Sequence, residues 1–342
     1  MKPESQDQKT VAELGEDAVL AAIIPLLPSA TGVLIGPGDD AAGLQTDGIT
    51  FLSTDTMVAE RDFSLAWSTP RDLGRKAVAS NLADIAAMGV VPTGLLVALT
   101  LPPSITLDWA LEFAAGLAQA IARLAPAAGV IGGDLALGDQ VHIAVTSVGV
   151  LGQGQAVTRA GAKPGDRVAI AGAQGWSAAG FALLSNGSDP QQPESGKAPA
   201  VRAAIAAHLS PEPPILLGDA ARRAGATALI DVSDGLMRDA GRIAKASRVT
   251  IDFDSAQLQP LIVPLLEVAA TLGGDSSEVA ARARDWVLRG GEDHCLLATF
   301  PEDSQLPDGF RIIGKVAAGE QCAVQLDGRP EAAGGWDSLS LR

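Results

Sequence analysis

The chain has 342 residues, which is long for one hydrophobic core and predicts two domains of about 150 residues each. Its 40 acidic residues outnumber its 25 Lys and Arg residues, and the resulting net charge of −15 disfavours binding to nucleic acids or to anionic membrane surfaces. With 47% hydrophobic and 19% charged residues, the chain is expected to fold around buried cores rather than to remain disordered.

The longest uncharged run, residues 85–107, contains three prolines and is therefore typical of a helix end, a strand and a loop rather than a membrane span. The polar, acidic N-terminus predicts no signal peptide. Cys295 and Cys322 are too few for a disulfide framework or a thiolate metal site. We therefore expect structural cysteines and a cytoplasmic protein.

In the first half, short apolar strands alternate with helices, which is typical of an α/β domain. Thr69, Pro70 and Asp72 form a helix-start pattern, and Gly89 ends the helix that follows it. A turn is expected at Gly132-Gly133-Asp134 between two strands within residues 130–150. The other expected elements are strands at 33–35, 49–52 and 93–101 and helices at 70–88 and 107–124.

A Gly/Gln-rich stretch at residues 151–155 precedes a new strand and helix pattern, so we place the domain boundary there. The predicted domains are residues 1–152 and 153–342. In the second, the polar segment 185–200 is expected to be a mobile loop. The other expected elements are strands at 167–171, 227–230, 294–300, 311–316 and 323–326 and a helix that ends at residue 246.

Small-residue turns that carry carboxylates recur in separate segments of the chain. Each one, taken alone, is typical of a simple turn or a helix cap. Together they indicate a shared functional site. Asp84 adds a further acidic residue, and most of its neighbours in the sequence are apolar. The four turns are Gly38-Asp39-Asp40, Ser53-Thr54-Asp55, Gly133-Asp134 and Asp231-Val232-Ser233-Asp234.

Aspartates that converge need cations, because two unit charges about 4 Å apart repel by roughly 4 kcal/mol at an effective dielectric constant of about 20. The ligands are oxygen atoms, and the three histidines, His142, His208 and His294, form no ligand-spaced pair. Such a set favours Mg²⁺, which shares its coordination with phosphate oxygens and so points to a nucleotide substrate. The sequence contains no P-loop, no dinucleotide-binding fingerprint and no protein-kinase motif set.

At these residues the sequence resembles the thiamine-monophosphate kinase family, whose relatives include aminoimidazole ribonucleotide synthetase, selenophosphate synthetase and a hydrogenase-maturation dehydratase. The resemblance implies an N-terminal α/β domain whose sheet forms a homodimer interface, and a C-terminal α+β domain. The segments that carry it are IGPGDDAA (35–42), STDTMV (53–58), KAVASNLADIAAMG (76–89), IGGDLALGD (131–139), TRAGAKPGDRVAIAG (158–172), IDVSDGL (230–236) and GGED (290–293).

The family pattern implies several Mg²⁺ ions and ATP as co-substrate. Gly133, Asp134, Arg159 and Ser233 would lie against ATP, and Asp55, Asp84, Asp134 and Asp231 would act in catalysis through the metal ions. Glu292, Trp336 and Asp62 would contact thiamine monophosphate, although some members have His where this chain has Asp62. The implied metal ligands are Asp40, Ser53, Thr54, Asp55, Asp84, Asp134, Asp231 and Asp234.

The implied reaction is ATP-dependent phosphorylation of thiamine monophosphate to thiamine diphosphate by in-line transfer, the final step of thiamine diphosphate biosynthesis. Two alternatives stay open. One is an aminoimidazole ribonucleotide synthetase-type ligase or cyclase, and the other is a non-catalytic acidic cation-binding protein. The selenophosphate synthetase and hydrogenase-factor readings are disfavoured, because this chain has no N-terminal or C-terminal cysteine.

Overall fold

The computed structural model describes residues 8–38, 40–190, 199–319, 323–332 and 334–335. The chain folds into two compact units. The first comprises residues 1–85 and 91–154, and the second comprises residues 86–90 and 155–342.

A four-stranded sheet forms the centre of the first unit, with the strand order β3-β6-β4-β5. β4 and β5 are parallel, whereas β6 is antiparallel to both of its neighbours. Along β4, Leu95, Val97 and Leu99 are buried, while Leu96 and Ala98, which point to the other face, are exposed. The strands are β3 (Ile49–Val58), β4 (Val91–Leu101), β5 (Gly129–Leu137) and β6 (His142–Leu151).

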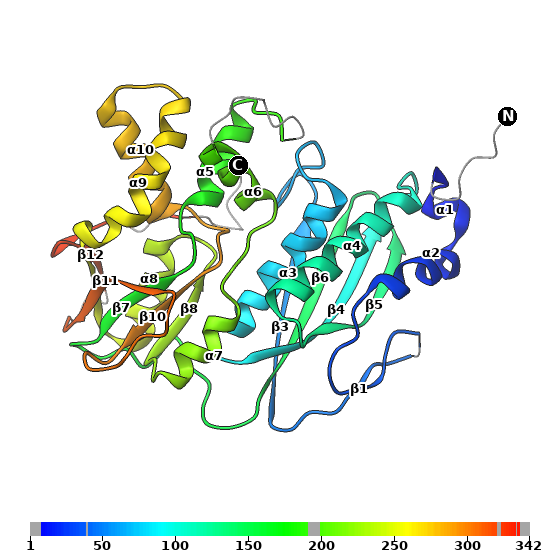
Figure 1. The fold of residues 1–342 in the computed structure, drawn as a ribbon, viewed down its shortest axis with the longest axis horizontal. Helices are drawn as coiled ribbons and strands as arrows, with labels where there is room; N and C mark the ends of the chain where they lie inside the picture. The colour runs from blue at the N-terminus through cyan, green and yellow to red at the C-terminus, as the bar shows by residue number, and fades with distance from the viewer. Residues whose placement is uncertain (1–7, 39, 191–198, 320–322, 333, 336–342) are drawn as a thin grey trace. The chain divides into compact units, whose positions relative to one another are not determined.

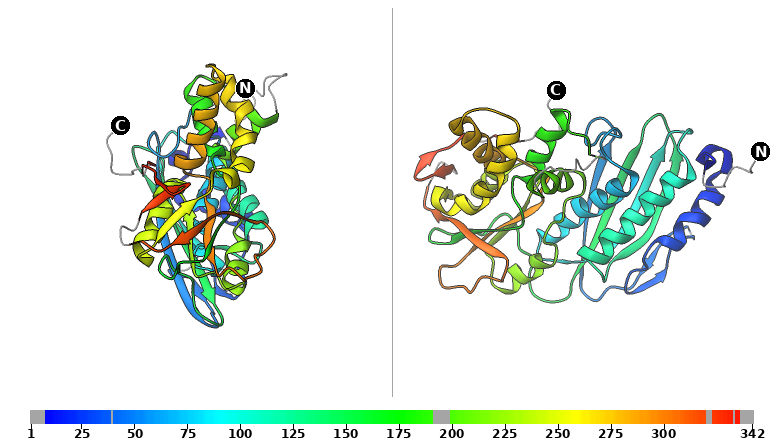
Figure 2. Two further views of the ribbon diagram at one scale, coloured as in Figure 1. Left: turned by 90° about the vertical axis from the view of Figure 1, so that its left-hand side faces the viewer. Right: turned by 45° about the horizontal axis from the view of Figure 1, so that its top comes forward.

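Two helices, α3 (Pro70–Ala86) and α4 (Leu107–Leu124), lie side by side over one face of this sheet (Figures 1 and 2). α3 begins at Pro70 because a reciprocal cap precedes it. The Asp72 N–H donates to Thr69 Oγ1 at 3.2 Å, and the Thr69 N–H donates to Asp72 Oδ2 at 3.1 Å. The helix start that the sequence predicts is therefore confirmed.

Glycines allow α3 and α4 to approach each other closely. A Cβ atom on Gly74 would lie 2.2 Å from the Phe113 carbonyl oxygen, and one on Gly116 would lie 2.2 Å from the Arg71 carbonyl oxygen. Because no side chain fits at either position, the helix pair depends on both glycines.

On the other face of the sheet lies a small two-stranded sheet of β1 (Val33–Ile35) and β2 (Gly43–Leu44). Val33 and Leu44 of this pair pack against a cluster formed by Ala30, Ile131 of β5 and Val148 of β6. The loop that joins β1 and β2 is thereby held on this side of the unit, which we call the open face. The N-terminal helices are α1 (Val11–Leu14), α2 (Glu16–Ile23) and the 3-10 helix η2 (Ile24–Leu26).

The second unit contains a seven-stranded sheet with the order β13-β12-β9-β11-β7-β10-β8. Its pairs are antiparallel except for β12 with β9. Cys295 to Phe300 of the inner strand β10 are all buried. The strands are β7 (Arg167–Ala171), β8 (Ala228–Val232), β9 (Thr250–Phe253), β10 (Cys295–Phe300), β11 (Phe310–Ala317), β12 (Val324–Leu326) and β13 (Arg329–Pro330).

Helices occupy the connections between strands from β7 to β10. Two of them, α5 and α6, flank residues 191–198, which lie outside the described part of the chain and make up half of the loop predicted at 185–200. The helices are α5 (Trp176–Ser185), α6 (Pro199–Leu209), α7 (Leu216–Arg223), α8 (Leu236–Ser247), α9 (Ser255–Thr271) and α10 (Ser276–Arg289).

Two sequence predictions about the first unit are wrong in the same way. The strand expected to end at residue 52 continues to Val58, and the turn expected at Gly132-Gly133-Asp134 lies inside β5. In both cases the neighbouring strand supplies hydrogen-bond partners through the polar stretch, so that Asp55 pairs with Val145 and Asp134 with Ala98. The carboxylates therefore project from strands rather than from turns.

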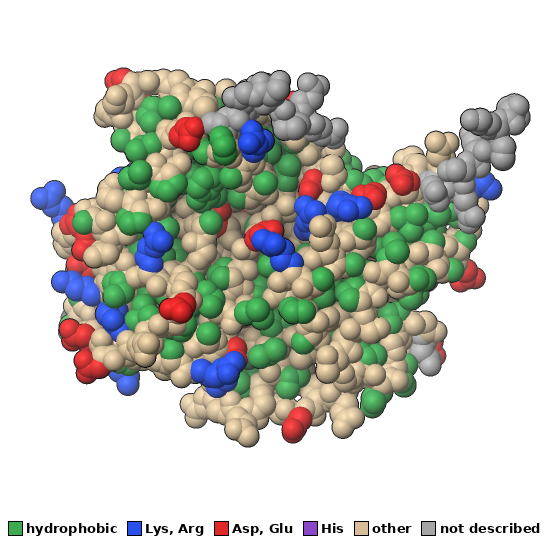
Figure 3. All heavy atoms as spheres, viewed as in Figure 1, with side chains coloured by type: hydrophobic (Ala, Val, Ile, Leu, Met, Phe, Trp, Pro, Cys, Tyr) green, Lys and Arg blue, Asp and Glu red, His purple; other side chains and the backbone are tan. Residues whose placement is uncertain are grey.

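Every helix in the described residues falls short of the length and apolar character that a bilayer crossing requires. On the face drawn in Figure 3, Lys and Arg side chains are interspersed with acidic ones over the described residues. This face therefore offers no extended basic patch, in keeping with the net charge of −15.

Candidate active site

Strand β3 and helix α3 bring together three of the predicted site residues. Ser53 and Asp55 are two residues apart on the strand, so their side chains share a face. Ser53 Oγ donates to Asp84 Oδ2, in the last turn of α3, at 2.7 Å. Asp55 accepts the N–H of Thr56 through Oδ1 at 2.7 Å, and its side chain is exposed. This part of the site consists of oxygen ligands only.

Thr54 lies on the opposite side of the same strand. Its hydroxyl donates to the Val145 carbonyl oxygen at 3.1 Å and accepts from Thr146 Oγ1 at 3.1 Å. Both contacts are to β6, so the Thr54 side chain is fixed on the open face, away from Ser53.

Gly133 and Asp134 lie on the other edge strand, β5. A Cβ on Gly133 would lie 2.0 Å from the Val97 carbonyl oxygen, so glycine is required there. Three spacings between strands separate β3 from β5, which places Asp55 and Asp134 about 14 Å apart in one chain. Two carboxylates that share a Mg²⁺ each approach it to about 2.1 Å, so these two cannot bind one ion within a single chain.

The remaining acids of the first unit have separate positions. Asp40 is exposed in the loop between β1 and β2, and Asp39 lies outside the described residues. Ala42 of this loop lies near the residue before Gly133, because a Cβ atom on Gly132 would be 3.9 Å from Ala42 Cβ. Asp62 accepts the N–H of Val58 through Oδ2 at 2.8 Å, so its carboxylate holds the turn that follows β3.

In the second unit, Asp231 and Asp234 flank the turn that leads from β8 into α8. Asp231 is buried, with Oδ2 3.3 Å from His294 Nδ1. Asp234 forms an ion pair with Arg242, and Arg238 Nε lies 3.8 Å from it. A metal ion at Asp234 would therefore have to displace or share these arginine contacts.

The motif that contains Ser233 lies directly against the one that contains Glu292. The Glu292 N–H donates to the Ser233 carbonyl oxygen at 2.8 Å. A Cβ on Gly291 would lie 2.3 Å from that same oxygen, so this close approach explains the second glycine of the GGED segment. Trp336, the other predicted substrate contact, lies outside the described residues.

Sequence reasoning missed two buried carboxylates next to these motifs. Asp239 accepts the N–H groups of Asp234 and Gly235 at 3.0 and 3.1 Å, and burial raises its pKa to about 6 even though Arg242 opposes the shift. Asp293 accepts from Gly175 and Ser177, and burial raises its pKa to about 7. Asp293 stands inside GGED, and its signal would have been an acid that directly precedes a continuous apolar strand.

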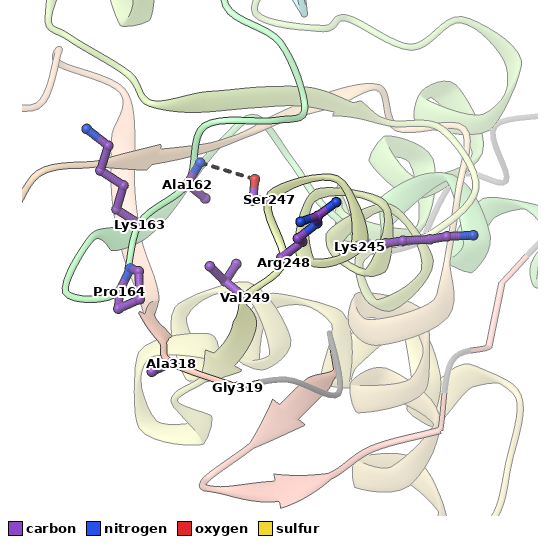
Figure 4. A pocket seen from close by; sticks show the side chains of 9 residues that line it. All are labelled: Ala162, Lys163, Pro164, Lys245, Ser247, Arg248, Val249, Ala318 and Gly319. Atoms are coloured by element: carbon purple, nitrogen blue, oxygen red, sulfur yellow. Dashed lines mark hydrogen bonds between the residues drawn. The ribbon is translucent and has the colours of Figure 1, made fainter.

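Arg159 lies on an exposed loop that Ser247 of α8 secures. Ser247 Oγ donates to the Arg159 carbonyl oxygen at 3.0 Å and accepts from the N–H groups of Gly161 and Ala162 at 3.1 Å each (Figure 4). A cavity of about 920 Å³ adjoins this loop, and three of its lining residues are basic. They are Lys163, Lys245 and Arg248, and the two lysines point away from each other.

The residues fit Mg²⁺ by the chemistry of their donors, because the predicted ligands carry carboxylate or hydroxyl oxygens. Over the part of the chain that the structure describes, no three His, Cys, Asp or Glu side chains gather closely enough to hold a metal ion. Cys295 is buried, and burial raises the pKa of its thiol, which fits the structural role expected for it.

Comparison with known proteins shows which family this geometry belongs to. Residues 38–151 match the family model for AIR synthase related protein, N-terminal domain. The chain is 40% identical over 335 residues to thiamine-monophosphate kinase from Mycobacterium tuberculosis H37Rv, covering 97% of this chain and 94% of that one. The chain belongs to the thiamine-monophosphate kinase family. It is thus a kinase, as the sequence motifs predict.

Solved structures support the same assignment. Thiamine-monophosphate kinase from Stenotrophomonas maltophilia has a TM-score of 0.74 at 31% identity, covering 92% of this chain and 96% of that one. AaThiL complexed with AMPPCP and TMP also has a TM-score of 0.74, at 29% identity, covering 95% of this chain and 97% of that one. The predicted combination of an α/β with an α+β fold in the aminoimidazole ribonucleotide synthetase class is therefore confirmed.

Proposed function

We propose that this protein transfers the γ-phosphoryl group of ATP to thiamine monophosphate, giving thiamine diphosphate and ADP, in a single in-line step that several Mg²⁺ ions assist. The observation that carries the proposal is the likeness, along 95% of the chain, to a structure that contains AMPPCP, an ATP analogue, together with TMP. Two phosphorylated ligands need cations beside them, and the acidic motifs that recur in this chain carry carboxylates that bind such cations.

The attacking atom is a phosphate oxygen of thiamine monophosphate, which is already anionic, so that no general base is needed. The difficulty is the approach of two negatively charged groups, and bound Mg²⁺ would neutralise that charge and align the oxygens. In the first unit we assign the ligands Asp40, Ser53, Thr54, Asp55, Asp84 and Asp134. In the second unit we assign Asp231 and Asp234.

The residues of the chain prepare this chemistry by fixing the ligands. Ser53 donates to Asp84, so the carboxylate is oriented before any ligand arrives. Gly133 lets the backbone of β5 run close to Val97, and we assign its exposed stretch, with Arg159 and Ser233, to ATP. The hydrogen bond that Ser247 Oγ donates to the Arg159 carbonyl oxygen fixes the backbone from which the Arg159 side chain extends.

Thiamine monophosphate carries a thiazolium cation, and we assign its recognition to Glu292 and Trp336. A carboxylate provides charge complementarity, and an indole face adds a cation–π contact worth about 0.5–2 kcal/mol. Asp62, which the family pattern also implicates, already accepts a backbone hydrogen bond from Val58. We therefore assign Asp62 a supporting position at the substrate rather than the main ionic contact.

We propose a homodimer, because the open face of the first unit carries exposed apolar side chains. Leu52 of β3 is 67% exposed and Leu96 of β4 is 37% exposed, and both lie on this face. In one chain Asp55 and Asp134 lie too far apart to bind the same ion. In a dimer, Asp55 of one chain and the partner subunit's Asp134 can bind one Mg²⁺ ion together.

A product assay tests the function directly. The protein is incubated with ATP, Mg²⁺ and thiamine monophosphate, and products are identified by mass, with formylglycinamidine ribonucleotide as the alternative substrate. We expect thiamine diphosphate and ADP in equal amounts. Turnover of the ribonucleotide alone would instead support the synthetase-type reaction, and Mg²⁺ binding without ADP release would support a non-catalytic protein.

A further inference from the structure

The turn that carries Glu292 has an unusual backbone. Glu292 and His294 have φ angles of +64° and +52°, a left-handed conformation that residues other than glycine seldom adopt. Such a conformation persists only where the surroundings fix it. The backbone of this turn is held from one side by the Glu292 N–H, which donates to the Ser233 carbonyl oxygen at 2.8 Å.

The first turn of α5 holds the same segment from another side. Asp293 accepts the Gly175 N–H at 2.6 Å through one oxygen and the Ser177 N–H at 2.7 Å through the other. Gln174, just before this turn, donates to the Gly290 carbonyl oxygen at 2.7 Å. The segment that carries Glu292 is therefore anchored to α5 at both ends.

The Glu292 side chain contacts a histidine of the neighbouring helix α6. Its Oε2 atom lies 3.5 Å from Nδ1 of His208, a buried residue in the last turn of α6. The same Nδ1 atom lies 3.1 Å from Ser177 Oγ. The imidazole also contacts the Phe181 ring of α5, with 5.5 Å between ring centroids. The histidine ring is thus fixed by α5 and faces the Glu292 carboxylate.

These three polar side chains do not form a nucleophilic triad. In a triad the serine and the acid contact different ring nitrogens, whereas Ser177 and Glu292 both approach Nδ1. Ser177 is also buried, which closes it to a substrate. A carboxylate only accepts hydrogen bonds, so the approach of Nδ1 to Glu292 is favourable in the state in which Nδ1 carries the proton, and Ser177 Oγ then accepts from the same N–H group.

We propose that His208 is a positioning residue that holds the Glu292 carboxylate in the orientation that receives the cationic thiazolium ring of thiamine monophosphate. This inference rests on the proposed function. Glu292 remains 37% exposed, so a ligand can reach it, whereas the His208 side chain is only 8% exposed and acts from behind. The histidine acts on the acceptor substrate through Glu292 and does not touch ATP.

The test is a set of steady-state measurements with thiamine monophosphate and ATP varied separately. We expect His208→Ala to raise the KM for thiamine monophosphate about fivefold, with kcat and the KM for ATP changed less than about twofold. His208→Asn should restore most of the affinity, because its amide nitrogen occupies the position of Nδ1. His208→Gln should not, because its amide nitrogen falls at the position of Nε2.

A double variant separates positioning from a general structural effect. If His208 acts through Glu292, His208→Ala should add nothing to the KM of Glu292→Ala. Val201→Ala, at another buried position of α6, is the matched control and should lower the thermal stability without changing either KM. The inference would be overturned if His208→Ala left the KM for thiamine monophosphate unchanged. It would also be overturned if the KM increases of His208→Ala and Glu292→Ala multiplied in the double variant.

The outcomes distinguish this inference from the proposed function. If the wild-type protein makes no thiamine diphosphate, the proposed function fails and the inference fails with it. If the wild type is active but His208→Asn and His208→Gln behave alike, only the inference fails. That comparison remains decisive even if His208→Ala folds poorly, because both variants fill the space of the imidazole with an amide.

Discussion

A hydrogen bond between Ser53 Oγ and Asp84 Oδ2 links strand β3 to helix α3 at the proposed metal site. Asp84 is half-buried, and neighbours such as Leu82 and Ile85 are fully buried, so a charge on its carboxylate needs hydrogen-bond donors or a cation beside it. The Asp84 carboxylate is therefore placed to bind a metal ion, and burying it without a partner would lower the stability of the fold.

We expect Asp84→Asn to abolish most of the kinase activity, by at least about a hundredfold in kcat/KM, while the fold survives. The amide keeps the size of the side chain and can still accept from Ser53, but it removes the charge that a metal ion needs. Activity is measured over a Mg²⁺ titration, and folding by circular dichroism. Asp108→Asn, at an exposed position of α4, is the control, and near-wild-type turnover of Asp84→Asn at limiting Mg²⁺ would contradict the metal assignment.

Asp293 gives a prediction about stability and pH. Its pKa is raised to about 7 by burial, so between about pH 4 and pH 7 the folded protein holds a proton that the unfolded chain releases. Its contribution to the free energy of unfolding is therefore present at low pH and is lost as the pH rises through 7, by up to about 1.4 kcal/mol per pH unit.

We expect Asp293→Asn to remove this dependence and to lower the stability overall, because one of the two backbone N–H groups that the carboxylate accepts would face an amide NH₂ group. An unpaired buried donor of this kind costs about 1–3 kcal/mol. Urea unfolding at pH 5 and pH 8 measures both effects. The destabilisation relative to the wild type should be larger at pH 5, and an equal value at the two pH values would show that Asp293 is not protonated in the folded state.

At the scale of the elements, the sequence predicts the helices α3, α4 and α8 but not where the carboxylate-bearing strands end. The Thr69 and Asp72 cap and the span of α4 at residues 107–124 follow from local patterns that need no partner. The polar stretches within β3 and β5 predict turns, because Gly, Ser, Thr and Asp residues are typical of turns. Only the ladder to the neighbouring strand, a long-range interaction, keeps them extended.

The same limit explains what was missed in the second unit. α9 contains Pro260 and Pro264, which argue locally against a helix, yet Leu258, Leu261 and Leu265 of this helix are buried. Tertiary packing outweighs the local cost. Likewise the sequence marks Glu292 through its motif, but the roles of Asp239 and Asp293 depend on burial and on backbone N–H groups from other segments.

The contact of α3 with α4 gives a prediction for an element pair. We expect Gly116→Ala to destabilise the protein by about 2–3 kcal/mol, because the new Cβ atom would meet the Arg71 carbonyl oxygen and force the helices apart. Gly241→Ala in α8 is the control, since its Cβ would lie 3.8 Å from a Val324 methyl group. That change should stabilise the helix by about 0.5–1 kcal/mol. Chemical denaturation of both variants checks the opposite signs.

At the scale of the whole molecule, the positions of Asp55 and Asp134 connect catalysis to assembly. They lie on opposite edge strands of one sheet and on opposite faces of it, Asp55 on the face that α3 covers and Asp134 on the open face, which also exposes Leu52 and Leu96. If two copies pair through this face, each proposed site uses Asp55 of one chain and the partner subunit's Asp134. An isolated chain would then bind Mg²⁺–ATP poorly, however well it is folded.

Mixed dimers test this arrangement. Asp55→Asn and Asp134→Asn chains, each inactive alone, are co-expressed with different affinity tags, and the heterodimer is purified through both tags. One of its two sites receives both intact carboxylates, so we expect about half of the wild-type activity per dimer. A heterodimer of Asp55→Asn with Asp84→Asn is the matched control and should stay inactive, because β3 and α3 of the same chain supply both residues, so that each site is damaged once. Absence of activity in the first heterodimer would show that each chain completes its own site, and the separation between β3 and β5 would then require different metal ions at Asp55 and at Asp134.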